Sequence, residues 1–172
     1  MVNSICIISF YKFIKISNLN SLKLKIEKIC KKFETKGTIL IAPEGINGTI
    51  EGSDLNIKRF LKELKIDKKF SDLEPKYSYS TKDSFNRMKV RLKKEIVTIG
   101  NTAIDPNKHI GKYIEPSEWN EFISDPNTIL IDTRNEYEVS IGTFKGAINP
   151  ETKSFRDLPN WIKSNLEEKE DN

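Results

Sequence analysis

The chain has 172 residues, of which 37% are hydrophobic and 31% are charged. This balance excludes a disordered polar chain, and the length leaves room for one ordinary domain, or for a small domain and part of another. No apolar run approaches the ~20 residues that span a bilayer, and the start lacks a signal-peptide cleavage site, so we expect no membrane partner and a cytoplasmic location.

The net charge of +4 hides an uneven distribution along the chain. Residues 1–100 carry 21 Lys and Arg against 11 Asp and Glu, a balance of +10, whereas residues 101–172 carry 8 against 14, a balance of −6. A basic half is a sign of contact with nucleic acid, although lysines can also simply solvate the exposed faces of helices. The two cysteines are too few for a disulfide framework, which agrees with a reducing compartment.

The hydrophobic periodicity of the first hundred residues predicts alternating strands and helices. Strands are expected at residues 5–10, 38–42, 48–51 and 76–80, where β-branched and apolar residues gather. The order of these elements with the two helices between them is β-α-β-β-α-β. Residues 1–100 are therefore predicted to form a ferredoxin-like domain.

The two helices of this region are recognised by their caps and apolar stripes. The first is predicted to begin at a cap at Asn20 or Ser21 and to end at Gly37, and the second to begin at Ser53 or Asp54. Their predicted buried stripes are Leu22, Ile26, Ile29, Cys30 and Phe33 in the first helix, and Ile57, Phe60, Leu61 and Leu64 in the second.

Residues 43–48, with the sequence PEGING, lie between the second and third predicted strands. Their glycines and the Asn47-Gly48 pair favour a tight hairpin turn. The alternative is a loop in which exposed amides and Asn47, with Glu44 nearby, contact a phosphate or a base.

Residues 87–93 carry the clearest local pattern in the chain. Side chains alternate across a strand, so Met88, Val90 and Leu92 are expected to face a core. Alternate residues lie about 6.5–7 Å apart, a spacing similar to that of successive phosphates in a nucleic-acid strand. The outward row is therefore predicted to bind nucleic acid, and it consists of Arg87, Lys89, Arg91 and Lys93. The alternative is an edge strand that lysines protect against unwanted pairing, although arginine, which binds phosphate through two hydrogen bonds, favours the first interpretation.

Residues 101–116 contain Pro, Gly and Asn without periodicity and are predicted to be a linker. The only histidine, His109, lies in it without acidic or cysteine neighbours, which is typical of a surface residue rather than a ligand or a base. Cysteines and histidines do not occur at ligand spacing, so no metal site is predicted.

Residues 117–172 change to an α/β pattern. A helix is expected over 117–123, a buried strand over 128–131, and a short strand with a turn over 147–150. The apolar residues expected to face inward are Trp119, Phe122 and Ile123 in the first helix, and Phe155, Leu158, Ile162 and Leu166 in a final one. Two strands and three helices do not close an α/β layer, so this region is expected to be an incomplete domain.

Asp132 and Arg134 follow the predicted strand at its carboxyl end, where ligands collect in parallel sheets. They are therefore candidate site residues. The alternative is that they cap helices, with Asn135 as the cap of the next helix, and that they pair with each other or with a loop.

Three stretches of the chain resemble a known family: GTILIAPEGINGTIEG, FNRMKVRLKKEIVTIG and IDTRNEYEVSIGTFKGAINP, with FYKF and YIEPSEWN in agreement. They are similar to the bacterial tRNA uridine hydroxylases, which are rhodanese-containing tRNA-modifying proteins. The resemblance implies an α+β chain with a ferredoxin-like domain at 1–100, followed by the first part of an α/β rhodanese-like domain at 117–172. It also implies tRNA as a partner and oxidation of the wobble uridine to 5-hydroxyuridine by molecular oxygen. No flavin, haem or iron site is recognisable.

The resemblance further implies a catalytic cysteine in a rhodanese loop, which we expect beyond Asn172. Cys6 in a core strand and Cys30 on a buried helix face cannot replace it, because a buried thiol is inert. Asp132 and Arg134 would support the rhodanese-like site, and the cations of residues 87–93 would bind tRNA.

The chain is therefore expected to be the N-terminal portion of a hydroxylase, inactive alone and completed by the missing C-terminal half of the rhodanese domain. Two alternatives are a non-catalytic tRNA-binding protein and a protein-interaction module. The latter would use the acidic second half and the exposed edge of its sheet.

Overall fold

The computed structural model describes residues 4–96 and 111–166. The first range belongs to one compact unit and the second range to another. None of the helices in these two ranges combines the length and the apolar character that crossing a membrane requires. The greater part of the predicted linker, with His109, lies outside the described residues, and residues 111–116 contain no helix or strand.

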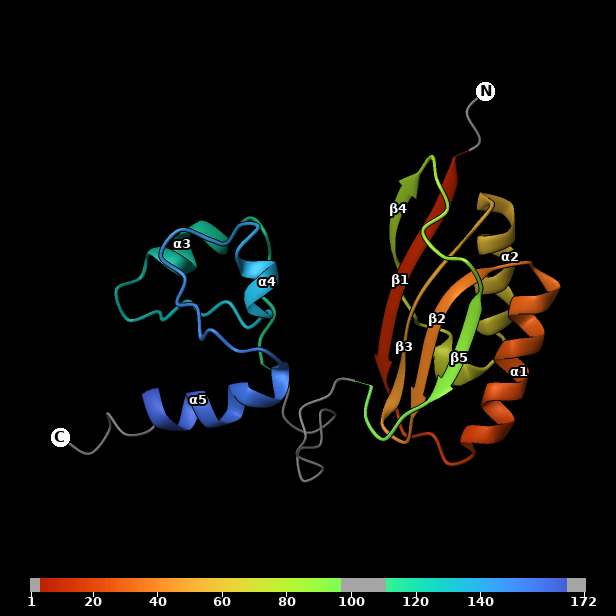
Figure 1. Ribbon diagram of the computed structural model, residues 1–172, viewed down its shortest axis with the longest axis horizontal. Coiled ribbons are helices and arrows are strands. Elements are labelled where there is room, and N and C mark those ends of the chain that lie inside the picture. Colours follow the sequence, from red (N-terminus) through yellow and green to blue (C-terminus); the bar gives the residue numbers. More distant parts are fainter. Residues whose placement is uncertain (1–3, 97–110, 167–172) are drawn as a thin grey trace. The chain divides into compact units, whose positions relative to one another are not determined.

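The first unit is a five-stranded sheet with two helices on one face (Figure 1). Its strands are β1 (Ile5–Phe13), β2 (Lys36–Ala42), β3 (Gly45–Gly52), β4 (Lys76–Ser80) and β5 (Met88–Leu92). Their spatial order is β4-β1-β3-β2-β5, and the first four strands pair antiparallel, as in a ferredoxin-like fold. The predicted ferredoxin-like domain is therefore confirmed, and β5, which pairs parallel with β2, extends its sheet.

The helices of the first unit are α1 (Leu19–Lys32) and α2 (Asp54–Leu64). The side chain of Asn18 caps α1 by accepting a hydrogen bond from the N–H of Ser21 at 3.0 Å, so the predicted cap at Asn20 or Ser21 is wrong. Asn18, Asn20 and Ser21 are all of a residue type that caps helices, and the structure uses the earliest of the three. The cap of α2 is Ser53, as one of the two predicted alternatives proposed.

Gly37 lies inside β2 and does not end α1, contrary to the prediction. The helix ends at Lys32, and Glu34, whose φ is 51°, takes the left-handed conformation that follows it. Gly37 has a φ of 135°, and a Cβ added there would lie 2.2 Å from the carbonyl oxygen of Thr49 on β3. Glycine is required at this position because two strands approach closely there.

A two-residue turn at residues 43–44 joins β2 to β3, since Gly45 already pairs within the sheet. The predicted tight turn within residues 43–48 is therefore confirmed, but the Asn47-Gly48 pair does not form it, because both residues lie inside β3. Gly48 faces the ring of Phe10, and a Cβ added there would lie 2.9 Å from that ring. The glycine therefore makes room for an aromatic side chain on the neighbouring strand.

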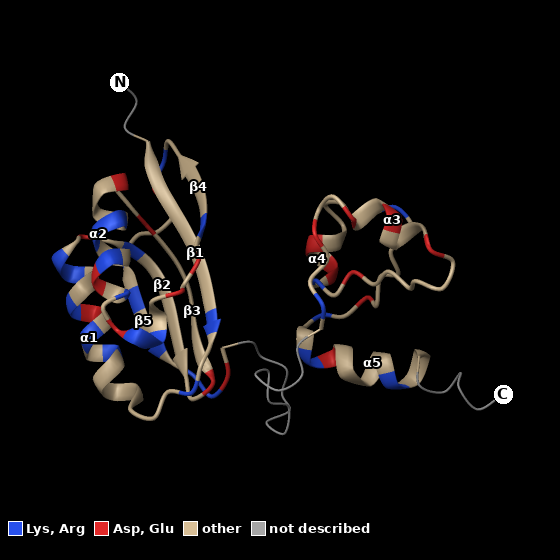
Figure 2. Ribbon diagram, turned by 180° about the vertical axis from the view of Figure 1, so that it is seen from behind, with Lys and Arg blue, Asp and Glu red and all other residues tan. Residues whose placement is uncertain are grey.

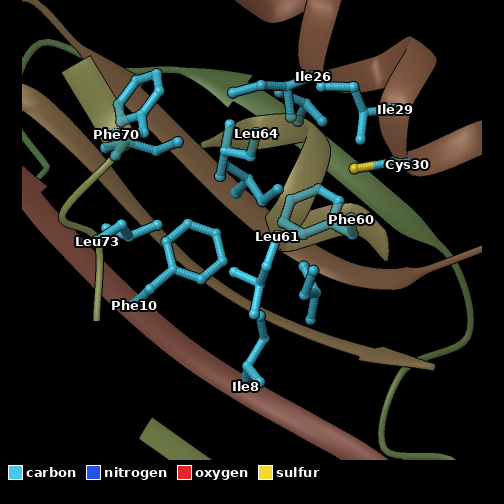
Figure 3. Packing of buried hydrophobic residues seen from close by; sticks show 14 of the residues in the cluster. Ile8, Phe10, Ile26, Ile29, Cys30, Phe60, Leu61, Leu64, Phe70 and Leu73 are labelled. Atoms are coloured by element: carbon cyan, nitrogen blue, oxygen red, sulfur yellow. The ribbon is translucent and has the colours of Figure 1, made fainter. Parts of the chain in front are cut away.

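The hydrophobic core of the first unit lies between the sheet and the two helices (Figure 3). The rings of Phe10 on β1 and Phe60 on α2 are 6.3 Å apart. The predicted stripes are confirmed as buried, except that Phe33 is only partly buried: Leu22, Ile26, Ile29 and Cys30 on α1, and Ile57, Phe60, Leu61 and Leu64 on α2. Full burial of each large apolar side chain contributes roughly 1.5–3 kcal/mol, so this layer dominates the stability of the unit.

The second unit contains short helices and very little sheet. Its helices are α3 (Trp119–Ser124), α4 (Glu136–Val139) and α5 (Leu158–Asn165), with a 3-10 helix at Phe155–Asp157 before α5. Asn135 forms a capping box with Glu138 at the start of α4, as predicted. The two predicted strands meet only in a single parallel bridge, between Ile131 and Ile148.

Two apolar side chains of the second unit depart from the prediction. Phe122 is 49% exposed and Ile129 is 60% exposed, although both were expected to face inward. Among the described residues of this unit, the buried hydrophobic side chains are Val139 and Leu158. With so small a core, the periodic apolar residues have little to pack against.

Candidate nucleic-acid interface and a second polar site

The segment 81–87 crosses the sheet from the end of β4 to the start of β5 (Figure 1). Glu51, at the end of β3 and only 1% exposed, anchors this crossing. Its carboxylate accepts hydrogen bonds from the backbone N–H groups of Ser84 at 2.8 Å and Phe85 at 3.0 Å. This role of Glu51 is not predicted from the sequence. The signal that could have indicated it is a single carboxylate in a strand that has no other charged residue.

The chain that follows β5 is fixed by the turn between β2 and β3. The Oε1 atom of Glu44 accepts a hydrogen bond from the N–H of Ile96 at 2.7 Å, and the Nδ2 atom of Asn47 donates to the carbonyl oxygen of Ile96 at 3.3 Å. These two side chains therefore bind the backbone of the same protein, where one of the sequence interpretations expected a phosphate or a base.

The register of β5 places its cations on the face of the sheet away from the helices. Lys89 lies opposite Thr38, and Arg91 lies opposite Leu40. Arg87 and Lys93 directly precede and follow β5 and continue the same two-residue spacing. The predicted row thus lies at the edge of the sheet, which agrees with both sequence interpretations of it.

The opposite side of β5 follows the predicted alternation only in part. Val90 is buried and Met88 is partly buried against the core. Leu92, which was expected to face the core, is 38% exposed. An edge strand has a neighbour on one side only, so its last residue is less well covered than those of an inner strand.

The four cations are available to a ligand. Among the described residues, none of the four forms an ion pair, whereas Lys25, Lys32 and Lys36 each have a carboxylate partner. Lys and Arg are visible on β5 as well as on α1 and α2 (Figure 2). Two of the β5 cations line a polar cavity of about 460 Å³, whose walls are Thr38, Ser84, Phe85, Asn86, Arg87 and Lys89. This geometry can receive anionic oxygen atoms, for which guanidinium and ammonium groups are the natural partners.

The two cysteines are both buried, at 0% exposure for Cys6 and 1% for Cys30. Burial raises the pKa of the Cys30 thiol to about 11, and burial together with the nearby Asp54 raises the pKa of Cys6. A thiol that stays protonated is a poor nucleophile. Neither side chain can therefore act as a reactive cysteine in this fold.

Asp132 and Arg134 form a two-pronged ion pair in the second unit. The Nε and Nη2 atoms of Arg134 donate to the two carboxylate oxygens of Asp132, at 2.9 Å and 2.6 Å. The hydroxyl of Thr143 donates to the same carboxylate at 2.7 Å, and the Nη2 atom of Arg134 also donates to the carbonyl oxygen of Gly142 at 2.7 Å. The hydrogen bonds from Arg134 and then from Thr143 hold the pKa of Asp132 well below its usual range.

This ion pair joins the segment that ends at Asp132 to the loop at residues 142–143. Pairing of the two residues with each other or with a loop is one of the alternatives that the sequence leaves open. It also lines a cavity of about 620 Å³, together with Trp119 and Phe144, whose rings are 5.2 Å apart. Asp132 and Arg134 are close because they are two residues apart in the sequence. Thr143 is eleven residues away from Asp132, and only the fold places its hydroxyl beside the carboxylate. Among the described residues, no group of three His, Cys, Asp or Glu side chains gathers in a way that could hold a metal ion.

Comparisons with known proteins identify relatives of both units. Residues 5–96, more than half of the chain, match the family model of the UPF0176 acylphosphatase like domain. The chain is 51% identical over 157 residues to a tRNA uridine(34) hydroxylase of Rhizobium leguminosarum bv. trifolii, a match that covers 91% of this chain and 51% of that protein.

Two further proteins of the same name give the same picture. The protein from Acaryochloris marina is 49% identical over 160 residues, which cover 93% of this chain and 52% of the relative. The protein from Agrobacterium fabrum is 48% identical over 157 residues, which cover 91% of this chain and 50% of the relative. The chain thus spans about half the length of the curated relatives that it matches.

The similarity extends across the basic sheet unit and the second unit alike, and the family model fits the observed strand order of the first. The chain therefore belongs to the family of the UPF0176 acylphosphatase like domain, which it carries at residues 5–96, and it is similar over most of its length to about half of each relative named tRNA uridine(34) hydroxylase.

Proposed function

We propose that this chain is the tRNA-binding portion of an enzyme that oxidises the wobble uridine of tRNA to 5-hydroxyuridine. The names of three relatives at 48–51% identity support the reaction and the substrate. The observation that carries the binding role is the row of Arg87, Lys89, Arg91 and Lys93 (the β5 row), which forms no ion pair among the described residues. The register places Lys89 and Arg91 of this row on the face away from the helices.

The β5 row would contact the phosphate backbone. Alternate residues of a strand lie about 6.5–7 Å apart, so Arg87, Lys89, Arg91 and Lys93 can each meet a different phosphate. Such contacts position a nucleic acid without reading its sequence. Selection of the wobble uridine then depends on other groups of the enzyme.

The second unit would be the start of a rhodanese-like domain, with Asp132 and Arg134 shaping its site. Their ion pair lines the 620 Å³ cavity and ties the loop at Thr143 to it. The family resemblance implies a reactive cysteine in that domain, and the two cysteines of this sequence are buried in the first unit with raised pKa values. We infer that these 172 residues alone do not form 5-hydroxyuridine.

The reaction is tested in bacteria that lack their own uridine hydroxylases. The chain is expressed in them, and the nucleosides of their tRNA are measured by mass spectrometry, with the Rhizobium leguminosarum relative as the control. We expect 5-hydroxyuridine to return with the relative and to stay absent with this chain. Its return with the chain alone would show that no reactive cysteine of the rhodanese type is needed.

The binding role is tested by replacing all four β5 cations with glutamine. We expect affinity for tRNA to fall about 100-fold or more at low salt, and the slope of log K against log salt to decrease by about 3, since each phosphate contact contributes about 0.7–0.9 to it. The matched control replaces four exposed helix lysines with glutamine: Lys28, Lys31, Lys62 and Lys68. If both variants lose the same affinity, net charge rather than the β5 row binds tRNA.

A second candidate function is protein interaction through the second unit. Large apolar side chains are exposed there, among them Ile141 at 87%, Tyr137 at 68% and Phe144 at 57%. The relatives are about twice as long as the matched part, and we propose that rhodanese-like polypeptide of the same enzyme covers this surface. Binding of this kind would persist in high salt, whereas phosphate binding would weaken steeply.

A further inference from the structure

Among the described residues 4–96, two segments lie over the face of the first sheet that is turned away from α1 and α2, one at each end. At one end the segment 81–87 lies over it, held by the carboxylate of Glu51, which projects from this face. At the other end Ile96 lies over it, held by Glu44 and Asn47 and in close contact with Gly45. Between these two segments, the part of the face that no other described residue covers is a strip that runs across the strands.

Two rows of side chains cross this strip from strand to strand. The first row is Tyr11, Asn47, Leu40 and Arg91, which lie opposite one another in the register of β1, β3, β2 and β5. The second row is Lys76, Ser9, Thr49, Thr38 and Lys89, which continues onto β4. An aromatic ring therefore lies on β1, and cations lie at both edges. The centre holds hydroxyl groups, the side chain of Leu40 and the amide of Asn47, which is hydrogen-bonded to Ile96 at one border of the strip.

Tyr11 presents its ring to solvent at a defined angle. The residue is 52% exposed, and its ring is 6.2 Å from the ring of Phe13 in an edge-to-face contact at 69°. Contact with Phe13 restricts the orientation of the Tyr11 ring. An exposed aromatic on a sheet is a surface on which a nucleic-acid base can stack, because every base has a π face.

The positions of the aromatic ring and the cations indicate which kind of ligand fits the strip. Tyr11 and Arg91 are three strand intervals apart, about 14 Å at ~4.8 Å per interval, a length that a few nucleotides span. A ring at one end and a guanidinium at the other match a base and a phosphate of the same strand. Bases in a duplex are stacked on one another and cannot reach Tyr11, so the strip fits a single strand.

We propose that this strip binds unpaired nucleotides of RNA, with one base stacked on Tyr11 and neighbouring phosphates on Arg91 and Lys89. The inference rests on the proposed function, because it takes the β5 cations as phosphate ligands. It adds a base contact that the cations do not supply, and it selects single strands over duplexes.

The test measures binding of the 172-residue chain to an oligouridylate of eight nucleotides, to an RNA duplex of the same length and to inorganic polyphosphate. Tyr11→Ala should weaken oligouridylate binding roughly 5- to 100-fold, and leave polyphosphate binding unchanged. Tyr11→Phe should keep the affinity, since it keeps the ring. Tyr77→Ala is the matched control, because Tyr77 is 48% exposed but lies opposite Ile8, on the helix side of the sheet.

A photocrosslink adds a readout that does not depend on a substitution. An oligonucleotide that contains 4-thiouridine should crosslink to the peptide with Tyr11, as mapped by mass spectrometry. Equal binding of oligouridylate by Tyr11→Ala, equal binding of duplex and single strand, or loss of polyphosphate binding in Tyr11→Ala would each overturn the stacking role.

The result also separates this inference from the proposed function. If the four-cation variant loses its affinity for tRNA while Tyr11→Ala keeps its affinity for oligouridylate, phosphate binding by the cations is supported and base stacking on Tyr11 is refuted. If the unaltered chain binds neither tRNA nor oligouridylate, both proposals fail and the strip remains for a protein partner.

Discussion

At the scale of single residues, Glu51 controls the position of β5 more directly than any of the cations. Its buried carboxylate accepts two backbone hydrogen bonds from the crossing segment. Glu51→Ala leaves those N–H groups without their acceptor, so we expect the free energy of unfolding to fall by about 1–3 kcal/mol. Urea denaturation measures this loss, and hydrogen exchange at Ser84 and Phe85 should accelerate.

The control for this prediction is Glu74→Ala, because Glu74 is exposed. We expect Glu74→Ala to change stability by less than about 0.5 kcal/mol. Unchanged protection of the Ser84 and Phe85 amides in Glu51→Ala would mean that other contacts hold the crossing segment.

Cys30 provides a pH-dependent prediction. Burial raises the pKa of its thiol to about 11, above the ordinary cysteine value of about 8.5. The folded protein thus keeps the proton more tightly than the unfolded chain, and the associated stability is complete below pH ~8.5 and is lost as the pH rises toward 11. Cys30→Ser should reduce this loss when stability is measured by urea denaturation between pH 8 and pH 10.

The same burial predicts slow chemical labelling. At pH 8 the thiolate fraction for a pKa of about 11 is roughly 200-fold smaller than for the ordinary value. Iodoacetamide should therefore label the cysteines much more slowly in the folded protein than in concentrated urea. Rapid labelling of the folded chain would contradict the burial of both thiols.

At the scale of elements, the close packing of β1 against β3 makes Gly48 sensitive to a small change. A Cβ at Gly48 would lie 2.9 Å from the ring of Phe10, whereas a Cβ at Gly52 would lie 3.6 Å from its nearest neighbour, Ile57. We expect Gly48→Ala to lower the free energy of unfolding by about 1–3 kcal/mol through overpacking. Gly52→Ala, the matched control, should be tolerated. Thermal denaturation measures both variants, and equal melting temperatures would mean that the strands move apart to accommodate the methyl group at residue 48.

The helices and the first four strands could be predicted from the sequence because their signals are local. The stripe of Ile57, Phe60, Leu61 and Leu64 repeats at helical spacing, and Ser53 provides the cap. The role of Gly37 inside β2 could not be predicted, because glycine is needed there to leave room for the carbonyl oxygen of Thr49 on another strand. Local sequence does not contain such a contact.

The candidate sites show the same division. The alternation at residues 87–93 and the proximity of Asp132 to Arg134 are properties of neighbouring residues, and the structure places them as the spacing indicates. The roles of Glu51 and Thr143, and the alignment of Tyr11 with Arg91 across the sheet, depend on strand order. Strand order at the β2 edge, where β5 joins after crossing the sheet, has no local signal.

At the scale of the whole molecule, the two units differ in how much they bury. The core of nineteen residues from Cys6 to Val90 belongs to the first unit. The second unit buries two hydrophobic side chains among its described residues, Val139 and Leu158. Apolar burial is the main source of stability, so we expect the second unit to unfold first.

The chain offers a direct way to measure this difference. Both tryptophans, Trp119 and Trp161, lie in the second unit, whereas the sheet and the longer helices lie in the first. We expect the urea midpoint followed by tryptophan fluorescence to be lower than the midpoint followed by far-UV circular dichroism. Coincident midpoints would show that the units unfold together.

Two substitutions assign the transitions to the units. Asp132→Asn removes the charge that pairs with Arg134, and it should lower the fluorescence midpoint alone. Phe60→Ala leaves a cavity in the first core, costs about 3–5 kcal/mol, and should lower the midpoint seen by circular dichroism.

The attachment of β5 to the edge of the sheet has a consequence for how this surface can change over generations. Of its five residues, Val90 alone is fully in the core, and the ferredoxin-like arrangement of the other four strands does not depend on the cations. Selection can therefore alter the charge pattern of β5 residue by residue, while the inherited scaffold keeps its packing. The same property makes β5 the natural position for a laboratory library of variants, in which most members should still fold.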